Sequence, residues 1–377
     1  MSDTEPEGSH PAASPGEAVR AAMERLGWSQ SDLGYVLGVT TATISQIIAG
    51  KRGISPAMAK ALGRALGMAP QALVTMQAEW ELHHADEPSP IVDARAQLLS
   101  RYPLREMVKR GWLPETDKPD ELERRACRFF GIGALDESPH LAHAARRAKA
   151  GDVSGHQLAW LFRVRQIAKT MQVEPFSVAQ LKHAMARLSE ARGEPEGVRH
   201  VPRVMREAGV RFVVVEAFPS SEIDGVCFWL DESSPVIGVS LRFDRIDNFW
   251  FVLAHECTHA ILGHGKDGAF IIDADLTSTI GREIMEEERL ANKGGAEFCV
   301  AQDKMTSFYL RKNPLFSERD VLAFAKRMGV HPGLVVGQLQ WKTGRFELLR
   351  RHLAKIRDHL SSTMMFDGWG DVMPIGE

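Results

Sequence analysis

The chain has 377 residues, a formal net charge of -3, 44% hydrophobic and 25% charged residues. This length exceeds one ordinary hydrophobic core and favours two or three domains, and the composition is typical of a soluble globular protein. The slightly acidic balance excludes a chain that binds nucleic acid over its whole surface, so any nucleic-acid surface must be local.

The N-terminus, residues 1–16, is acidic and proline-rich, and we expect a disordered tail there. It has neither the basic nor the apolar region of a signal peptide, and no apolar run reaches the roughly 18–20 residues of a membrane span. We therefore expect a cytoplasmic protein with no membrane partner. Reduced, buried thiols are expected for the four widely spaced cysteines, Cys127, Cys227, Cys257 and Cys299.

Residues 17–85 contain short helical patterns separated by glycines, and they predict an all-α domain. Ser29 can cap a helix that ends at Leu37, and Gly38 permits a tight left-handed turn after it. A second short helix is expected from Thr40 or Thr41, with its isoleucines facing inward. Two short helices across such a turn predict a helix-turn-helix. Six basic and three acidic residues between 17 and 66 give this region a local charge of +3.

The stretch "GWSQSDLGYVLGVTTATISQIIAGKRGISP" resembles the Cro/repressor-type helix-turn-helix, and its surroundings are similar to HigA-type antitoxins, which also repress their own operons. The resemblance covers about residues 14–85, with Gly34 where alanine is usual. Because one domain with a charge of +3 neutralises few phosphates, we expect a homodimer bound to a palindromic, double-stranded DNA operator. By this resemblance, Thr41, Ala42, Ser45 and Gln46 meet base edges, and Gln30, Thr40, Thr43, Lys51 and Arg52 hold phosphates. The alternative is a helical bundle that only docks a protein partner.

The remainder of the chain predicts a helical linker segment over residues 91–200 and then a different domain over 201–345. Runs rich in β-branched and aromatic residues occupy 210–218, 225–230 and 235–241. The last two flank "DESSP", a turn sequence, so we expect a hairpin within a small antiparallel sheet. Residues 346–377 are expected to form a C-terminal helix and tail.

The stretch "FWFVLAHECTHAILGH" predicts a buried helix from about Arg245 to Leu262, capped by Asp244. His255 and His259 are four residues apart, so they share one helix face and can both reach one metal ion. Glu256 is turned about 100° away, which suits a base acting beside the metal. This is the H-E-x-x-H arrangement. The alternative is a chance match of two ordinary helix histidines.

A third ligand is expected from "MEEERLANKGGAEFCV", where Glu288 and Asn292 are four residues apart and face the same way. Glu288 can complete the metal site. Asn292 can orient a ligand histidine without binding the metal itself. Gly294 and Gly295 weaken the helix that would carry them, because each costs about 1 kcal/mol relative to alanine.

The motifs from "IDGVCFWLDESSP" through "HECTH" and "EEERLAN" to "GVHPGLVVGQLQ" resemble the ImmA/IrrE metallopeptidases over roughly residues 205–345. The resemblance implies zinc bound by His255, His259 and Glu288, with Glu256 as general base. An oxyanion-stabilising residue stays open, with His264 and Tyr309 as candidates.

The sequence therefore predicts an α+β protein, in which an all-α helix-turn-helix domain and a helical segment precede a zincin-like domain. The predicted function is a DNA-binding transcriptional regulator with a zinc-dependent endopeptidase that cleaves a regulatory protein or itself. Two alternatives remain open. One is a non-catalytic repressor that senses a metal or ligand, and the other is a HigA-type antitoxin that neutralises a ribonuclease toxin by binding.

Overall fold

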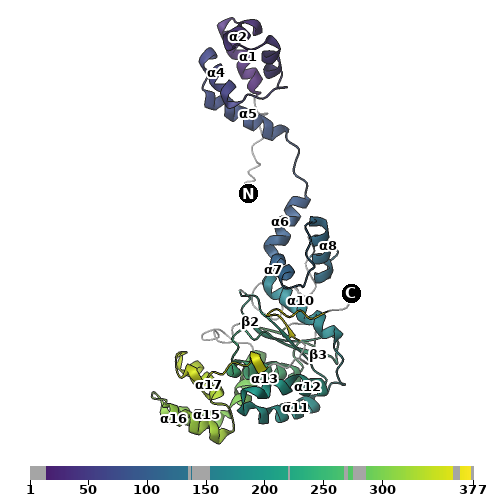
Figure 1. The fold of residues 1–377 in the computed structure, drawn as a ribbon, viewed down its shortest axis with the longest axis vertical. Helices are drawn as coiled ribbons and strands as arrows, with labels where there is room; N and C mark the ends of the chain where they lie inside the picture. Colours follow the sequence, from purple (N-terminus) through teal and green to yellow (C-terminus); the bar gives the residue numbers. More distant parts are fainter. Residues whose placement is uncertain are drawn as a thin grey trace, which may run out of the picture. The chain divides into compact units, whose positions relative to one another are not determined.

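A computed structural model describes residues 14–134, 137, 153–219, 221–266, 271–274, 286–359 and 366–374 (Figure 1). The chain separates into two compact units, Met1–Pro90 and Ile91–Glu377, and each is described by itself. Most of the tail expected over 1–16 lies outside the described residues, and the first helix already begins at Pro15.

The N-terminal unit is helical, as predicted. Its helices are α1 (Pro15–Leu26), α2 (Gln30–Leu37), α3 (Thr41–Ile48), α4 (Pro56–Leu66) and α5 (Pro70–His84). Ser29 caps α2, because its hydroxyl accepts a hydrogen bond from the Asp32 backbone N–H at 3.2 Å. The predicted inward face of α3 is confirmed, since Ile44, Ile47 and Ile48 are all buried.

The path of the chain from α2 into α3 depends on two glycines, Gly34 within α2 and Gly38 at its C-terminal end. Gly38 has φ 68°, which favours glycine over any residue with a side chain. A Cβ at Gly34 would lie 2.9 Å from the carbonyl oxygen of Val39, so the alanine usual at this position would be crowded. The close approach of α2 to the chain that enters α3 therefore accounts for Gly34.

The segment expected to be a helical linker is part of the second unit. It comprises α6 (Ile91–Arg101), α7 (Leu104–Lys109), α8 (Pro119–Phe130), α10 (Gly155–Thr170), α11 (Val178–Glu190), η1 (Ala191–Gly193), η2 (Pro195–His200) and α12 (Val201–Glu207). Trp160 of α10 is fully buried and donates its indole N–H to the carbonyl of Val215 at 2.8 Å. Because α10 packs directly on the sheet, this part of the segment belongs to the core of the unit.

The sheet consists of β1 (Arg211–Val215), β2 (Ile223–Trp229), β3 (Pro235–Val239), β4 (Ile271–Ala274) and β5 (Phe366–Asp367), in the order β4-β2-β3-β1-β5. The antiparallel pairing of β2 with β3 confirms the predicted hairpin. However, β1 runs parallel to both β3 and β5, so the sheet is mixed rather than antiparallel. The α+β class is confirmed.

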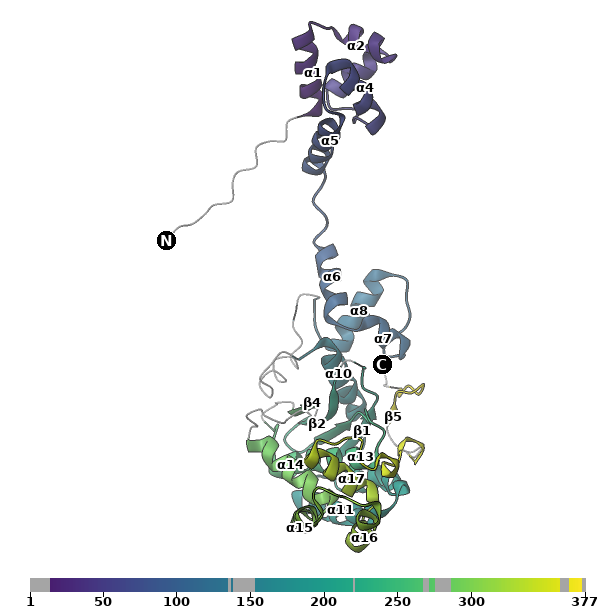
Figure 2. The same cartoon turned by 90° about the vertical axis from the view of Figure 1, so that its left-hand side faces the viewer.

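Two helical layers cover the two faces of this sheet (Figure 2). Cys227 of β2 packs in one core cluster, whereas its neighbours Val226 and Phe228 pack in the other, on the side of α10. The first cluster is formed with α13 (Ile246–Leu262), α15 (Gln302–Lys312), α16 (Glu318–Met328) and α17 (Pro332–Thr343). Helix α14 (Glu286–Cys299) packs along α13.

The C-terminal helix expected within 346–377 does not occur in the described part of that range. The chain forms the 3₁₀ turns η3 (Arg350–His352) and η4 (Arg357–His359), and then β5. Asp367 is buried, where it forms an ion pair with the buried Arg163 and accepts a hydrogen bond from the Trp112 indole at 2.6 Å. These contacts fix the C-terminal segment against β1 and α10.

Candidate metal centre and recognition helix

The start of α13 differs from the prediction. Asp244 does not cap the helix; Arg245 occupies the N-cap position, and Asp244 has φ 45°. The Asp244 carboxylate accepts hydrogen bonds from the backbone N–H groups of Ile356, at 3.1 Å, and Arg357, at 2.8 Å. Asp244 therefore holds the chain near residues 356 and 357 in place, although these residues are more than 100 positions away in sequence.

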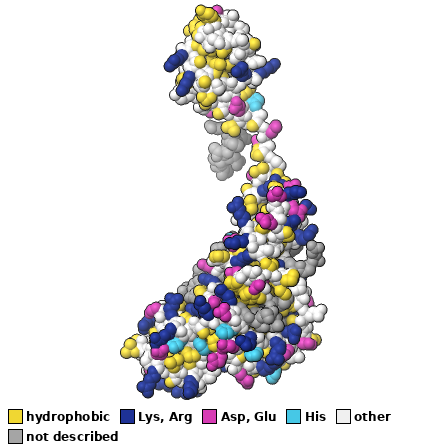
Figure 3. Space-filling view, viewed as in Figure 1, with side chains coloured by type: hydrophobic (Ala, Val, Ile, Leu, Met, Phe, Trp, Pro, Cys, Tyr) yellow, Lys and Arg dark blue, Asp and Glu magenta, His cyan; other side chains and the backbone are white. Residues whose placement is uncertain are grey.

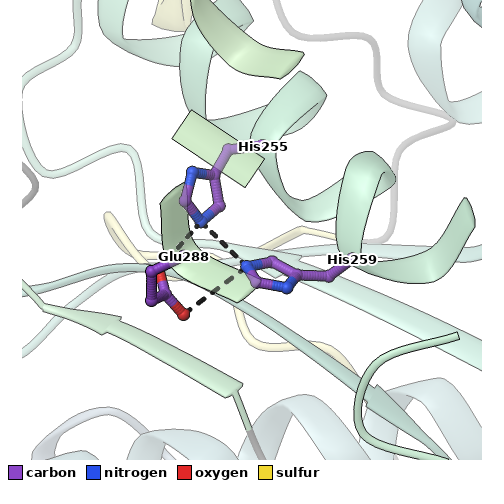
Figure 4. Close-up of side chains that lie close together, drawn as sticks. All are labelled: His255, His259 and Glu288. Carbon is purple, nitrogen blue, oxygen red and sulfur yellow. Dashed lines mark hydrogen bonds and ion pairs between the residues drawn. The ribbon is translucent and has the colours of Figure 1, made fainter. Parts of the chain in front are cut away.

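His255, His259 and Glu288 point toward one another from α13 and α14 (Figure 4). The His255 and His259 Nε2 atoms are 3.0 Å apart, and they lie 3.4 Å and 3.6 Å from the two Glu288 carboxylate oxygens. Both histidines are fully buried, whereas the Glu288 side chain is 22% exposed. The three donors therefore meet in one small, nearly enclosed volume.

This donor set fits a metal ion, because its ligand atoms all lie within 4.8 Å of one another. Two ligands about 2.0–2.1 Å from one ion in tetrahedral geometry are about 3.3 Å apart, close to the separations observed here. Two imidazole nitrogens and one carboxylate are also the donor types found around zinc with an open coordination position.

Contact between α13 and α14 brings Glu288 to the histidines. A Cβ at Gly294 would clash with Thr258 Oγ1, and a Cβ at Gly295 would lie 3.0 Å from the carbonyl oxygen of Phe251. Helix α14 runs through both glycines without a break, contrary to the doubt raised by their low helix propensity. The glycines allow the two backbones to approach closely, and that approach places Glu288.

Glu256 is fully buried and turned away from the face that bears the two histidines. Its carboxylate occupies the space beside Gly225 of β2, where a Cβ would lie 3.1 Å from the Glu256 carboxyl carbon and would overlap the carboxylate itself. The absence of a side chain at Gly225 therefore makes room for Glu256 between the helix and the sheet. This role of Gly225 was not recognised from the sequence, although a glycine inside a strand indicates close approach.

The other predicted residues of this region lie in different surroundings. His264 contacts His259, with 2.9 Å between their Nδ1 atoms. Tyr309 stacks on Phe316, with ring centroids 5.7 Å apart. Among the described residues no hydrogen bond joins the half-buried Asn292 to either histidine, so its orienting role stays a prediction.

All four cysteines are free; Cys227, Cys257 and Cys299 are buried, as expected, whereas Cys127 is only half-buried. Burial raises the pKa of Cys257 and of Cys299, because a thiolate is poorly solvated in an apolar interior. A thiol binds a metal ion only after it loses its proton. Cys257 packs in the core around α13, and the cluster of possible ligands comprises His255, His259 and Glu288 without it.

The N-terminal unit presents the predicted DNA-contact residues at its surface. Exposed positions are Thr40, Thr41, Ala42, Ser45, Gln46, Lys51 and Arg52, whereas Gln30 and Thr43 are half-buried. The hydroxyl of Thr40 caps α3 by accepting from the Thr43 backbone N–H at 3.2 Å. It also lies 3.0 Å from the Thr43 hydroxyl. The hydroxyls of Thr40 and Thr43, which are predicted to bind phosphates, thus already form hydrogen bonds within the domain.

Two basic residues follow directly on α3. The backbone N–H groups of Lys51 and Arg52 both donate to the carbonyl of Gln46, at 2.9 Å and 3.2 Å. Within the described residues neither side chain forms an ion pair. Figure 3 shows basic side chains at the surface of this unit. The end of α3 therefore carries two cations that are not neutralised by the protein.

Comparison with known proteins finds a family match for two segments of the chain. Residues 19–73 match a helix-turn-helix family, and residues 206–336 match the Peptidase M78 family, described as the IrrE N-terminal-like domain. The chain thus combines a helix-turn-helix domain with an IrrE-like domain, as the sequence predicts. The helix-turn-helix supports a DNA-binding regulator, and the second match supports a metallopeptidase-type domain. None of the curated proteins compared with the chain matches it.

Two solved structures are similar to part of the chain. One, from Nostoc punctiforme, is described as an antidote protein of a plasmid maintenance system; it is 31% identical, with a TM-score of 0.18, and the match covers 19% of this chain and 78% of that one. The other is a Pseudomonas aeruginosa protein in complex with its operator DNA. It is 33% identical, with a TM-score of 0.19, and the match covers 20% of this chain and 81% of that one.

Among the residues that the structure describes, no helix combines the length and the apolarity that crossing a membrane requires.

Proposed function

We propose that the protein is a transcriptional regulator in which a DNA-binding domain is joined to a zinc-dependent endopeptidase. The observation that carries this proposal is the convergence of His255, His259 and Glu288 within 4.8 Å, inside the residues that match the M78 family. Zinc bound there would act as a Lewis acid that activates water and polarises the peptide carbonyl. The substrate would be a regulatory protein or the chain itself.

Glu256 would act as the general base. Glu256 directly follows His255 in sequence, but its carboxylate lies beside Gly225 of β2 and is not one of the possible metal ligands, so the histidines and Glu288 would hold the metal without it. It would accept a proton from the attacking water and deliver that proton to the leaving amide nitrogen. Gly225 supports this role, because a side chain at position 225 would displace the Glu256 carboxylate.

The DNA-binding half would act as a homodimer on a palindromic operator. One domain with a local charge of +3 neutralises few phosphates, and two half-sites one helical turn apart double the contacts. Gln46, exposed on α3, would read a base edge, and Lys51 and Arg52 would hold phosphates. Cleavage of a partner or of the chain would then change the occupancy of the operator.

The experiment that tests this function combines metal analysis with a search for cleavage products. Purified wild-type protein and His255→Ala would be analysed for zinc and incubated with regulators encoded near the gene, and fragments would be identified by mass spectrometry. We expect one zinc per wild-type chain and discrete fragments, and neither for His255→Ala. Stoichiometric zinc without cleavage of any candidate or of the chain would favour a sensor. A neighbouring toxin gene, with neutralisation of its product by His255→Ala, would favour the antitoxin alternative.

A further inference from the structure

The turn that follows α13 brings His264 back against the metal centre. Gly263 has φ 75°, and this left-handed residue lets the backbone N–H of His264 donate to the carbonyl of His259 at 3.0 Å. The carbonyl of His264 in turn accepts from the indole N–H of Trp229 on β2 at 2.8 Å. The helix end and the sheet therefore both fix the position of His264.

The two nitrogens of the His259 ring face different groups. Nε2 lies 3.0 Å from His255 Nε2 and 3.6 Å from Glu288, whereas Nδ1 lies 2.9 Å from Nδ1 of His264. In a hydrogen bond between two imidazole nitrogens, one must carry the proton and the other must accept it. A histidine that binds metal through Nε2 carries its proton on Nδ1, so a metal-bound His259 would be the donor and His264 the acceptor.

We propose that His264 is a positioning residue that holds His259 in the tautomer and ring orientation required to bind metal through Nε2. The inference rests on the proposed metal centre and adds to it a residue that acts through a ligand. A hydrogen-bond acceptor behind a ligand imidazole fixes the ring and increases its basicity. Here an imidazole takes the place in which a carboxylate or a backbone carbonyl is more usual.

The same geometry separates His264 from the role of a third ligand. Its contact with His259 is made at the ring nitrogen opposite the donor cluster, and the cluster itself comprises His255, His259 and Glu288 without His264. It is therefore not a third ligand in place of Glu288. Acceptance at Nδ1 leaves the proton of a neutral His264 on Nε2, which is not part of the contact with His259.

The test compares zinc affinity in the full-length chain for wild type, His264→Ala and His264→Asn, by competition with a chelator of known affinity. Asparagine can place its amide oxygen near the position of the lost Nδ1 and accept the same proton. We expect His264→Ala to bind zinc about 10–100-fold more weakly and His264→Asn to recover most of that loss. His200→Ala, which changes an exposed histidine, is the matched control and should bind like wild type.

A second measurement does not depend on the folding of any variant. Ring-¹⁵N NMR of the zinc-free wild type should show His259 with its proton on Nδ1. A proton on Nε2 in the wild type would overturn the proposal, as would unchanged zinc affinity in His264→Ala or equal losses in the alanine and asparagine variants. Failure of the wild type to bind zinc would overturn the metal centre as well. Zinc binding without peptide cleavage would contradict only the proposed enzyme.

Discussion

Thr258 on α13 and Gly294 on α14 are in such close contact that a Cβ at position 294 would clash with Thr258 Oγ1 and lie 3.1 Å from its Cβ. Thr258 cannot easily move, because its hydroxyl donates to the carbonyl of Ala254 at 2.8 Å. This contact sets the distance between the helix that carries the histidines and the helix that carries Glu288. The geometry of the proposed metal centre therefore depends on a contact that includes none of its three ligands.

Gly294→Ala should lower both stability and zinc affinity. Overpacking of a close contact costs about 1–3 kcal/mol, and separation of the helices would move Glu288 from the histidines. Helix propensity alone would act in the opposite direction, stabilising α14 by about 1 kcal/mol. Urea denaturation and zinc titration measure the two effects, with the exposed Lys293→Ala as control. A more stable Gly294→Ala protein would contradict the close packing.

Removal of any of the three proposed ligand side chains should release zinc. We expect His255→Ala, His259→Ala and Glu288→Ala each to lack stoichiometric zinc after dialysis, whereas Glu286→Ala should retain it. Glu286 is exposed and forms its ion pair with Arg289 instead of facing the histidines. Elemental analysis measures the zinc content of each variant. Loss of zinc from Glu286→Ala together with its retention in Glu288→Ala would show that the third ligand is misassigned.

Local patterns in the sequence predicted the elements that carry the site, but not the contacts that assemble it. The four-residue spacing of His255 and His259 and the four-residue spacing of Glu288 and Asn292 each define a helix face, and the structure has both helices. Two glycines in α14 indicated a weak helix when only propensity was considered. Their role becomes visible once α13 lies beside them, because packing outweighs a propensity difference of about 1 kcal/mol per residue.

Substitutions on the N-terminal unit should separate base reading from phosphate binding. Gln46→Ala should reduce the preference for the operator over other sequences. Lys51→Ala and Arg52→Ala should weaken binding to all sequences alike, and each should reduce the slope of log K against log salt by about 0.9 per subunit of the dimer. Gel shifts over a salt series measure both effects, with the exposed Lys60→Ala on α4 as control. Equal affinity of the wild type for its own promoter and for unrelated DNA would contradict specific recognition.

Asp367→Asn should destabilise the second unit. Asp367 and Arg163 are buried together, and loss of the carboxylate would leave the Arg163 guanidinium buried without its counter-charge. Breaking such a pair from one side costs about 3–5 kcal/mol. Thermal or urea unfolding measures the change, and Asp371→Asn, at an exposed position of the same segment, should be nearly neutral. Similar stability of the two variants would mean that the C-terminal segment is not part of the core.

The C-terminal segment also shows the limit of prediction from local pattern. Strand β5 has two residues, too few for any periodicity, and it is defined only by parallel pairing with Val214 and Val215. Asp244 was predicted to cap α13 because it directly precedes the helix. Its carboxylate instead binds backbone N–H groups at 356 and 357, which no pattern near position 244 could indicate.

The most direct test of the account is the cleavage rate of Glu256→Gln, measured together with its zinc content and operator affinity. Glutamine preserves the volume of the side chain but cannot accept the proton from water. We predict wild-type zinc content and operator binding, with cleavage reduced by about 10²–10⁴-fold. Glu287→Gln, on an exposed residue beside Glu288, should cleave like wild type. Cleavage by Glu256→Gln at the wild-type rate would contradict the proposed general base and, with it, the assignment of this centre as a peptidase.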